Sequence, residues 1–459
     1  MTRALSAALF VAAICLTAGA QSPPSLTPQP ATLTGPVTYT CGKPKGTQKP
    51  LTATSRYTDE TAGWDLGTAP AVADGICSSP GETNPTPGVP ATASQPFFFS
   101  IPVPEGNYRA TVVLGGKQPS VLTVRAEARR LYVDQLPIPA GKTVTRELDI
   151  NVRVPEFSRP DGTPGRVRLK QREVGNLDWD HKLTLEFNGV RPSLRSITLQ
   201  PITEPVVYLA GDSTMVDQDV EPWASWGQML PRFFKPGIVI ANHAESGESS
   251  SSFMGEQRFP KILSLIKPGD YFFVQFAHND QKLGPDFPEK YRQIMTNFVE
   301  QVRAKGATPV IVTAMNRDEW DETGHIRQTL SPYPETSREI ANATDTALID
   351  LNAMSKTMFE AMGKDETNRA FMHFPANTFP DQSTAINDNT HFNNFGAYEL
   401  ARCIVHGIRE DKLPIEKFLD PTVADFNPAH PDAFSQFHLP YTPMQKKEDT
   451  TKIPQANLK

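Results

Sequence analysis

The sequence predicts an α/β protein, in which a three-layer α/β/α domain with a parallel sheet follows an all-β domain of the jelly-roll or β-sandwich type. Two changes of pattern lead to this prediction. Between 51 and 204, short runs of alternating apolar and polar residues are separated by turn residues, which is typical of sandwich strands. Between 205 and 418, continuous apolar runs of strand length alternate with helical stretches, as in parallel sheets covered by helices. A chain of 459 residues is long enough for two or three domains.

The first twenty residues have the pattern of a secretory signal peptide. Arg3 gives a positive start, residues 7–16 are apolar, and small residues at 18–20 form a cleavage site before Gln21. The apolar stretch is too short to cross a bilayer, and no later stretch has eighteen consecutive apolar residues. We therefore expect a periplasmic or secreted protein without a membrane anchor, cleaved near Ala20.

The charge balance argues against polyanionic partners. The chain has 45 Lys and Arg against 51 Asp and Glu, which gives a formal charge of −6. Without a basic cluster there is no electrostatic footprint for duplex DNA or an anionic membrane surface, where neutralised phosphates supply most of the affinity. We expect neither nucleic acid nor membrane as a partner.

The four cysteines suggest one disulfide rather than a metal site. Cys15 would leave with the signal peptide, and Cys403 falls on the apolar side of a helical pattern as a buried thiol. Cys41 and Cys77 could form a disulfide in an oxidising compartment. Metal binding is the weaker interpretation, because the sequence has no C-x-x-C, no H-E-x-x-H and no paired His at ligand spacing.

Before residue 204, the sequence predicts a flexible segment followed by the strands of the sandwich. Residues 21–50 are rich in Pro and Thr, so they are predicted to be a flexible lead-in. The sandwich strands that follow share alternating apolar residues and bounding Gly, Pro, Asn or Asp. They are expected at 97–101, 108–114, 120–124, 143–148, 167–169 and 182–187.

The second half is predicted to form the parallel sheet. Its strands lack polar alternation because helices bury both faces of such a sheet. They are expected at 206–210, 238–241, 271–276, 310–313 and 348–351. Residues 419–459 are Pro-rich and polar, and an extended or disordered tail is expected there.

Reactive residue types follow the strands at their carboxyl ends, where ligands bind in such sheets. Ser213 follows the first strand as a hydroxyl nucleophile, and Gly247 follows the second with an N–H that a reacting oxygen can approach closely. His278 and Asn279 follow the third, and Asn279 adds an amide donor. Taken singly, these residues have ordinary interpretations as a helix cap, a polar loop and an Asx-turn.

A carboxylate and an imidazole complete the set. Asp388 stands three residues before His391, ahead of a helical pattern. In a turn, the carboxylate accepts one ring N–H and leaves the other ring nitrogen facing a nucleophile. The alternative is a helix cap at Asp388 with an exposed His391. The agreement of all four strand-end features decides in favour of a catalytic crevice.

Residues 205–410 resemble the SGNH (GDSL) hydrolases, which have a flavodoxin-like fold, and most closely their rhamnogalacturonan acetylesterase branch. The α/β-hydrolase elbow G-x-S-x-G fails at Met215. The motifs that carry the resemblance are 208–215 (YLAGDSTM), 242–247 (NHAESG), 278–280 (HND) and Asp388-x-x-His391.

The resemblance implies an esterase that removes O-acetyl groups from plant cell-wall polysaccharide through an acyl-enzyme. Ser213 would attack the acetyl carbonyl, His391 would take its proton, and Asp388 would orient the imidazole. The N–H groups of Ser213 and Gly247 and the amide of Asn279 would form the oxyanion hole. No metal or other cofactor is implied.

Part of the first half resembles the galactose-binding-like β-sandwich that precedes this esterase in some bacterial proteins. Sugar stacking is one interpretation of Trp64 and Trp179 there, and of Trp223 and Trp226 after the nucleophile, but core packing is the first expectation. The similar stretches are 63–67, 97–100 and 176–180.

One departure from the family bears on the substrate. Glu248 follows Gly247, where relatives often carry Arg, and a carboxylate there would repel galacturonate. We therefore expect a neutral sugar near it, as in acetylated xylan, unless Arg258, Lys282 or Arg317 supplies the missing charge. Trp223, Glu248 and His278 are the candidate substrate-binding residues.

Two other classes of function stay open at this stage. An inactive secreted glycan-binding protein would not need the five catalytic residues that are present. A lipase or thioesterase of the same family would need an apolar acyl groove, whereas the loop after Gly247 is rich in serine. The oligomeric state is left open.

Overall fold

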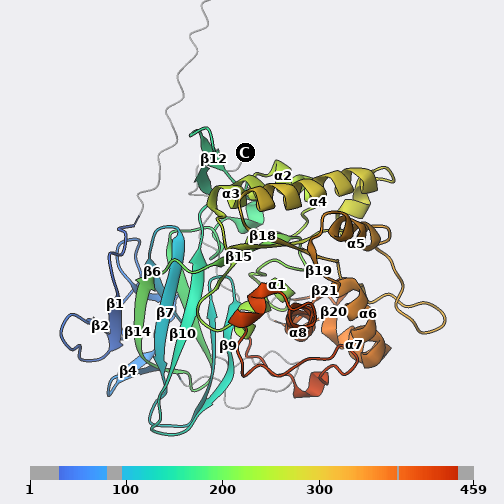
Figure 1. Ribbon diagram of the computed structural model, residues 1–459. Helices are drawn as coiled ribbons and strands as arrows, with labels where there is room; N and C mark the ends of the chain where they lie inside the picture. The colour runs from blue at the N-terminus through green and yellow to red at the C-terminus, as the bar shows by residue number, and fades with distance from the viewer. Residues whose placement is uncertain (1–29, 80–95, 380–381, 443–459) are drawn as a thin grey trace, which may run out of the picture.

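The computed structural model describes residues 30–79, 96–379 and 382–442 (Figure 1). The predicted signal peptide at 1–20 lies outside the described residues. A β-rich region, residues 30–201, lies beside an α/β region, residues 206–442, and both the sheet and the helices of the second region are visible at the right of Figure 1.

The β-rich region consists of two sheets that share one core. The first contains the strand order β10-β7-β14-β1-β2 and the second β3-β6-β13-β8-β9. Side chains from both sheets, such as Val112 and Leu199 from the first and Phe99 and Phe187 from the second, are fully buried together. The strands are β1 (Val37–Cys41), β2 (Lys49–Leu51), β3 (Gly63–Asp65), β4 (Ala71–Ala73), β5 (Ile76–Ser78), β6 (Phe97–Pro102), β7 (Gly106–Leu114), β8 (Ser120–Ala126), β9 (Arg130–Ile138), β10 (Val144–Val152), β11 (Glu156–Ser158), β12 (Pro164–Arg166), β13 (Lys182–Val190) and β14 (Ser193–Pro201).

Five of the six expected sandwich runs coincide with strands, and three expectations fail. The run 167–169 lies just after β12 and outside any strand, although the Val167 N–H donates to the Pro155 carbonyl at 2.8 Å, and strands β9 and β14 were not among the expected runs. The predicted flexible lead-in is wrong over 37–50, because β1 pairs with β14 and β2 pairs with β1. These pairings join segments far apart in the chain, so local composition does not reveal them.

The disulfide between Cys41 of β1 and Cys77 of β5 is present, and Cys403 is a buried free thiol. The bond closes a loop with a sequence separation of 36 residues. It therefore ties the first strand of the β-rich region to its sheet.

Replacing both Cys41 and Cys77 by Ala is expected to lower the free energy of unfolding by about 3 to 4 kcal/mol, because the open loop gains conformational entropy in the unfolded chain. Urea unfolding of the oxidised protein and the double variant measures the difference. Reductant should destabilise the parent protein and leave the double variant unchanged; equal stability of the two oxidised proteins would contradict this account.

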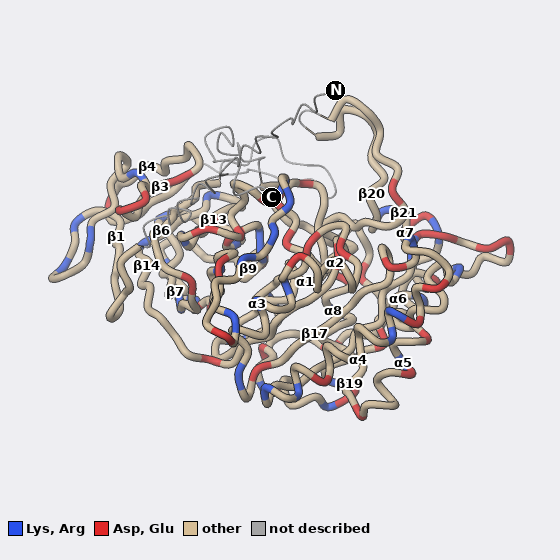
Figure 2. Tube along the Cα trace, turned by 90° about the horizontal axis from the view of Figure 1, so that it is seen from above, with Lys and Arg blue, Asp and Glu red and all other residues tan. Residues whose placement is uncertain are grey.

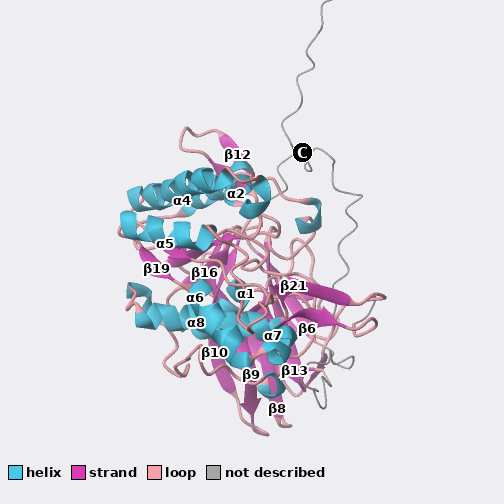
Figure 3. Cartoon of the chain, turned by 90° about the vertical axis from the view of Figure 1, so that its right-hand side faces the viewer, coloured by secondary structure: helices cyan, strands magenta, loops and turns pink. Residues whose placement is uncertain are grey.

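The α/β region has a five-strand parallel part with the order β19-β18-β17-β15-β16, which confirms all five predicted runs. Its helices lie on both faces (Figure 3), with α2 to α5 on one side and α1 and α6 to α8 on the other. The elements are β15 (Val206–Gly211), α1 (Trp226–Met229), β16 (Val239–Asn242), α2 (Ser250–Gly255), α3 (Arg258–Leu265), β17 (Tyr271–Gln275), α4 (Phe287–Ala304), β18 (Thr308–Val312), α5 (Tyr333–Ala343), β19 (Ala347–Ile349), α6 (Leu351–Met362), α7 (Lys364–Ala370), β20 (Phe371–Phe374), β21 (Ile386–Phe392) and α8 (Asn394–Glu410). Within the described ranges, the chain also has 3-10 turns: η1 (Gln171–Glu173) in the β-rich region, and η2 (Leu230–Phe233), η3 (Asp280–Leu283), η4 (Pro414–Phe418) and η5 (Phe434–Gln436) in the α/β region.

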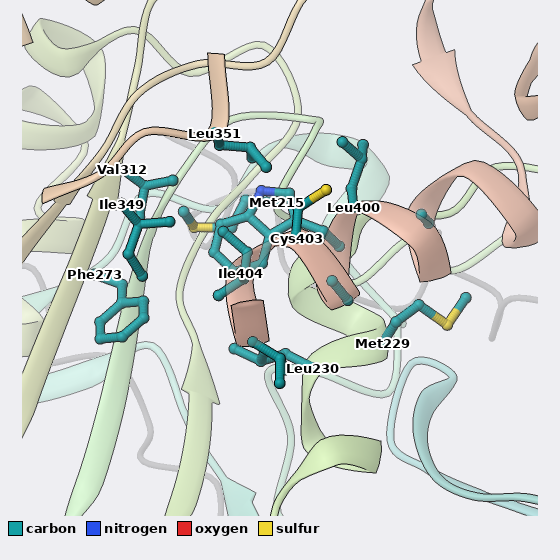
Figure 4. Close-up of a cluster of buried hydrophobic side chains, with 14 of the residues drawn as sticks. Met215, Met229, Leu230, Phe273, Val312, Ile349, Leu351, Leu400, Cys403 and Ile404 are labelled. Atoms are coloured by element: carbon teal, nitrogen blue, oxygen red, sulfur yellow. The ribbon is translucent and has the colours of Figure 1, made fainter. Parts of the chain in front are cut away.

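Successive residues of the buried strands enter opposite cores. Phe272 of β17 packs with α4, whereas Phe273 belongs to the cluster that faces α8. In Figure 4, Leu400 and Ile404 of α8 lie in this second cluster with Phe273 and Met215. Met215 comes from the loop after β15, so the core anchors the chain directly behind Ser213.

The two regions share one sheet. Strand β10 of the β-rich region lies beside β16 in parallel, with Ile150 opposite Ile240, so the sheet continues across the predicted boundary at 204. An extended or disordered tail was predicted for 419–459, and its described part, 419–442, is irregular chain with one 3-10 turn that packs on the α/β region rather than being disordered. There, Phe434 and Phe437 pack against Phe395 of α8 at ring distances of 5.3 and 5.6 Å.

Charged residues of both signs are interspersed over both regions in Figure 2. Among the helices of the described ranges, none has the length and apolar character needed to cross a bilayer.

Candidate active site

Ser213 lies directly after β15, at the carboxyl end of the sheet, and is 7% exposed. The preceding Asp212 accepts hydrogen bonds from the backbone N–H and the hydroxyl of Thr214, at 2.9 and 2.8 Å. This local turn ends the strand and fixes the direction of the chain at Ser213. Ser225 also stabilises the backbone at this point, because its hydroxyl donates to the carbonyl of Ser213 at 2.7 Å.

Ser213, His391 and Asp388 form a hydrogen-bonded chain. The Ser213 Oγ lies 2.7 Å from His391 Nε2, and His391 Nδ1 lies 2.7 Å from Asp388 Oδ2. The other Asp388 oxygen accepts the backbone N–H groups of Thr390 and His391 at 2.8 and 3.1 Å. The three residues predicted from separate strand ends are therefore in contact, in the order that a nucleophile, a base and an orienting carboxylate require.

The Asp388–His391 pair lies on a strand rather than in the expected loop before α8. Strand β21 pairs with β20, and the register jumps so that Phe371 lies opposite Phe392 while Met372 lies opposite Asp388. The residues between Asp388 and Phe392 therefore form a β-bulge. The bulge allows the His391 ring to contact Ser213 with one nitrogen and Asp388 with the other. Bulges are frequent beside active sites for this reason.

The surroundings keep Asp388 ionised. Burial alone would raise its pKa, but the hydrogen bond and charge of His391 and the two backbone N–H donors lower the pKa of Asp388 to about 2. An ionised carboxylate can hold a protonated imidazole beside Ser213.

This lowered pKa predicts a loss of stability in acid. As the pH falls below about 4, the unfolded chain takes up the Asp388 proton first, so protons favour unfolding. The stabilising contribution should be complete above that pH and should disappear as the pH falls toward 2. Urea unfolding of the parent protein and Asp388→Asn should differ most at pH 7, and the difference should shrink as the pH falls from 4 to 2, whereas a difference that grows in acid would contradict the assignment.

Gly247 lies in the loop after β16 with φ 77°, a left-handed conformation that favours glycine. A Cβ there would lie 3.6 Å from Arg172 Nη2 and 3.8 Å from Lys170 Nζ, two residues of the β-rich region. Asn279 donates from Nδ2 to the carbonyl of Glu248 at 2.9 Å, and its Oδ1 accepts from Lys282 at 2.9 Å. The loop and the amide are therefore coupled, and their roles as oxyanion donors stay predictions.

Glu248 is wrong as a candidate substrate-binding residue. Its side chain is 0% exposed, forms an ion pair with Lys170 and accepts the hydroxyl of Ser252 at 2.5 Å. Burial alone would raise the pKa of Glu248, but Arg258 and Lys170 hold it below its ordinary value. Because these cations neutralise the carboxylate, the reason for expecting a neutral sugar is removed.

His278 is also wrong as a substrate contact. It is 2% exposed, and its Nδ1 lies 3.4 Å from Asp212 Oδ2. Burial raises the pKa of Asp212, but His278 and the Thr214 donors outweigh it and lower that pKa. His278 thus supports the turn that precedes Ser213.

A pocket of about 270 Å³ opens beside His391. Of the residues predicted to bind substrate, Trp223 lines it. Its walls also include Arg172, Asn176 and Trp179 of the β-rich region. Asn176 and Trp179 belong to the stretch 176–180 that resembles the galactose-binding-like sandwich, and sugar stacking is one interpretation of Trp179 there. Asn176 and Arg172 are not among the predicted site residues, because only the fold brings them to the pocket.

The other two tryptophans have the expected core role. Trp64 is 1% exposed and donates to the carbonyl of Thr52 at 2.7 Å. Trp226 is fully buried, and its indole N–H donates to Gln275 Oε1 at 3.0 Å. Neither contributes to the pocket.

Comparison with known proteins gives consistent matches for the α/β region. Residues 209–397 match the GDSL-like Lipase/Acylhydrolase family. The chain is 41% identical over 216 residues to "Rhamnogalacturonan acetylesterase RhgT" of Bacillus subtilis (strain 168), covering 46% of this chain and 93% of that protein. It is 33% identical over 217 residues to "Probable rhamnogalacturonan acetylesterase YesY" of the same organism, covering 46% and 94%.

A solved structure extends over both regions. The crystal structure of YxiM from Bacillus subtilis is 21% identical in sequence, with a TM-score of 0.43, and the comparison covers 83% of this chain and 99% of that one.

Proposed function

Because the chain belongs to the GDSL-like lipase/acylhydrolase family, we propose that it is a secreted carbohydrate esterase that removes O-acetyl groups from rhamnogalacturonan or a related pectin. The hydrogen-bonded chain from Ser213 through His391 to Asp388 is the observation that carries the proposal. The names of the two similar Bacillus subtilis proteins support the choice of an acetylated glycan.

The geometry of the three residues supports the following reaction. His391 Nε2 takes the proton of Ser213 Oγ while this oxygen attacks the acetyl carbonyl, and Asp388 stabilises the imidazolium that forms. When the tetrahedral intermediate collapses, the sugar oxygen leaves with the proton from His391. A water molecule that His391 deprotonates then attacks the acetyl-serine; when this second intermediate collapses, the bond to Ser213 Oγ breaks, Oγ takes the proton back from His391, and acetate is released.

The oxyanion of each intermediate needs donors that are already in place. The backbone N–H groups of Ser213 and Gly247 and the amide of Asn279 would supply them. The hydrogen bond from Asn279 to the Glu248 carbonyl fixes the amide plane, which favours such a role.

Asn279→Ala is expected to lower kcat by about 10²- to 10³-fold with little change in KM, because the lost donor acts mainly in the transition state. Steady-state kinetics with 4-nitrophenyl acetate measures the effect. Asn297→Ala, the same substitution on α4, is the matched control. A loss below about fivefold, or a loss confined to KM, would remove Asn279 from the oxyanion hole.

The substrate is tested by acetate release from a panel of acetylated polysaccharides. The proposal predicts that acetylated rhamnogalacturonan and pectin are deacetylated faster than acetylated xylan at equal acetyl content. A preference for xylan would indicate a neutral glycan instead, and no release from any member would refute the carbohydrate assignment.

A further inference from the structure

We propose that the β-rich region is part of the substrate site: Trp179 and Asn176, together with Trp223, bind a sugar ring of the glycan next to the ester held at Ser213. The inference rests on the proposed function and adds to it the part of the chain that recognises the glycan. Its basis is the pocket beside His391, whose walls come from both regions.

Trp179 is held rigidly and remains partly open to the pocket. The Arg153 guanidinium lies 4.8 Å from its ring centroid, and the ring meets His243 edge-on at 5.6 Å. Arg153 is itself buried and paired with Asp178 and Asp217, at 3.4 and 3.7 Å. A half-buried indole that is already fixed in place can stack on a sugar without a large ordering cost.

Trp223 is positioned by the same region. Arg129 donates to the Trp223 carbonyl at 2.8 Å and pairs with Glu221 at 2.7 Å. Arg130, which follows Arg129 in the chain, pairs with Asp217 at 2.6 Å. All these charged side chains are buried, so separating the regions would leave unpaired buried charges, which is strongly unfavourable.

The segment just before Trp179 also holds the loop that carries Gly247. Lys170 donates to the carbonyl of Ser246 at 2.8 Å, and Arg172 pairs with Glu245 at 2.7 Å. Both contacts lie just before the predicted oxyanion donor Gly247, and Lys170 also pairs with Glu248 just after it. This arrangement places residues 170–179 against the site as one continuous wall.

The length of a similar protein bears on the role of residues 170–179. Of "Rhamnogalacturonan acetylesterase RhgT", 93% aligns with 216 residues of this chain, so that protein is too short to contain both regions. An esterase of this kind can therefore lack the β-rich region, and the proposal assigns to that region additional contacts with the glycan rather than the ester chemistry.

The chemistry of the pocket suits a sugar ring. Its volume of about 270 Å³ is near the lower end for small-molecule sites, roughly 300 to 1,000 Å³. Two indoles offer flat apolar surfaces, and the Asn176 amide both donates and accepts hydrogen bonds, as sugar hydroxyls require. An acyl chain would offer no hydrogen bonds to the Asn176 amide or the Ser246 hydroxyl, which a sugar ring can provide.

The test compares two substrates in the same enzyme. For each variant, kcat/KM is measured with acetylated rhamnogalacturonan oligosaccharides and with 4-nitrophenyl acetate, which has no sugar. In Trp179→Ala the ratio of the first value to the second should fall about tenfold, mainly through a higher KM for the oligosaccharide. In Asn176→Ala it should fall about threefold.

Phe157→Ala is the matched control, because Phe157 is a partly buried aromatic residue of the β-rich region that does not line the pocket. Trp179→Phe should recover part of the ratio. A lowered thermal unfolding temperature would show that Trp179→Ala is misfolded. In that case, the ratio measured for Asn176→Ala decides whether the wall contacts the glycan. An unchanged ratio in the folded variants, or equal losses with both substrates, overturns the inference. If the parent protein releases no acetate from the oligosaccharides yet cleaves 4-nitrophenyl acetate, the proposed function fails instead.

Discussion

Ser213→Ala is expected to lower kcat for acetate ester hydrolysis by about 10⁴-fold or more, because it removes the atom that forms the acyl-enzyme. The hydroxyl lies 2.7 Å from His391 Nε2, the distance at which the proton can be transferred as the attack begins. The residual rate would come from the oxyanion donors and from substrate binding. Acetate release and 4-nitrophenyl acetate hydrolysis both measure this change.

The fold should survive this substitution, because Ala keeps the Cβ of Ser213 and loses no packed carbon. Circular dichroism and the urea midpoint should therefore match the parent protein. Ser264→Ala on α3, whose hydroxyl donates to Lys261 within the helix, is a matched control for loss of a serine hydroxyl. Near-full turnover by Ser213→Ala would refute the proposed nucleophile.

Asp388→Asn is expected to lower kcat by about 10⁴-fold while the pocket keeps its shape. An amide carries no charge to stabilise the imidazolium, and its NH₂ group can donate to Nδ1 and select the wrong tautomer of His391. The 2.7 Å contact between Asp388 and His391 makes both effects direct. The variant should show unchanged KM and a much lower kcat.

The matched control for this substitution is Glu410→Gln, which neutralises a carboxylate beside His406 on the surface of α8. It should retain parent kinetics. If Asp388→Asn loses less than about tenfold in kcat, the carboxylate does not act through His391.

The parallel sheet could be predicted from the sequence because its strands are buried on both faces and therefore appear as continuous apolar runs. The alternating pattern used for the β-rich region did not identify β9, where Arg130, Asp134 and Pro137 interrupt the apolar positions. Arg130 is buried all the same, because Asp217 of the other region pairs with it. A polar residue whose partner is distant in the chain looks exposed when only its neighbours are considered.

Prediction of the candidate site from the sequence is limited in the same way, because some of its residues have partners that are distant in the chain. Ser213, Asp388 and His391 were found because a nucleophile and its base need particular residue types at strand ends. Glu248 was misjudged because its neutralising partner, Lys170, comes from the β-rich region. Asn176 belongs to the stretch 176–180 that resembles the galactose-binding-like sandwich, but its place in the pocket follows only from how the two regions pack.

The most direct test of the central claim is to identify the residue that an active-site-directed phosphonate ester labels. This reagent mimics the tetrahedral intermediate and reacts only with an activated nucleophile. The account predicts one adduct per chain, located by peptide mass spectrometry at Ser213, with parallel loss of esterase activity and no adduct in Ser213→Ala or His391→Ala. Full activity in a protein labelled at Ser213, or inactivation with the label on another residue, would contradict the account.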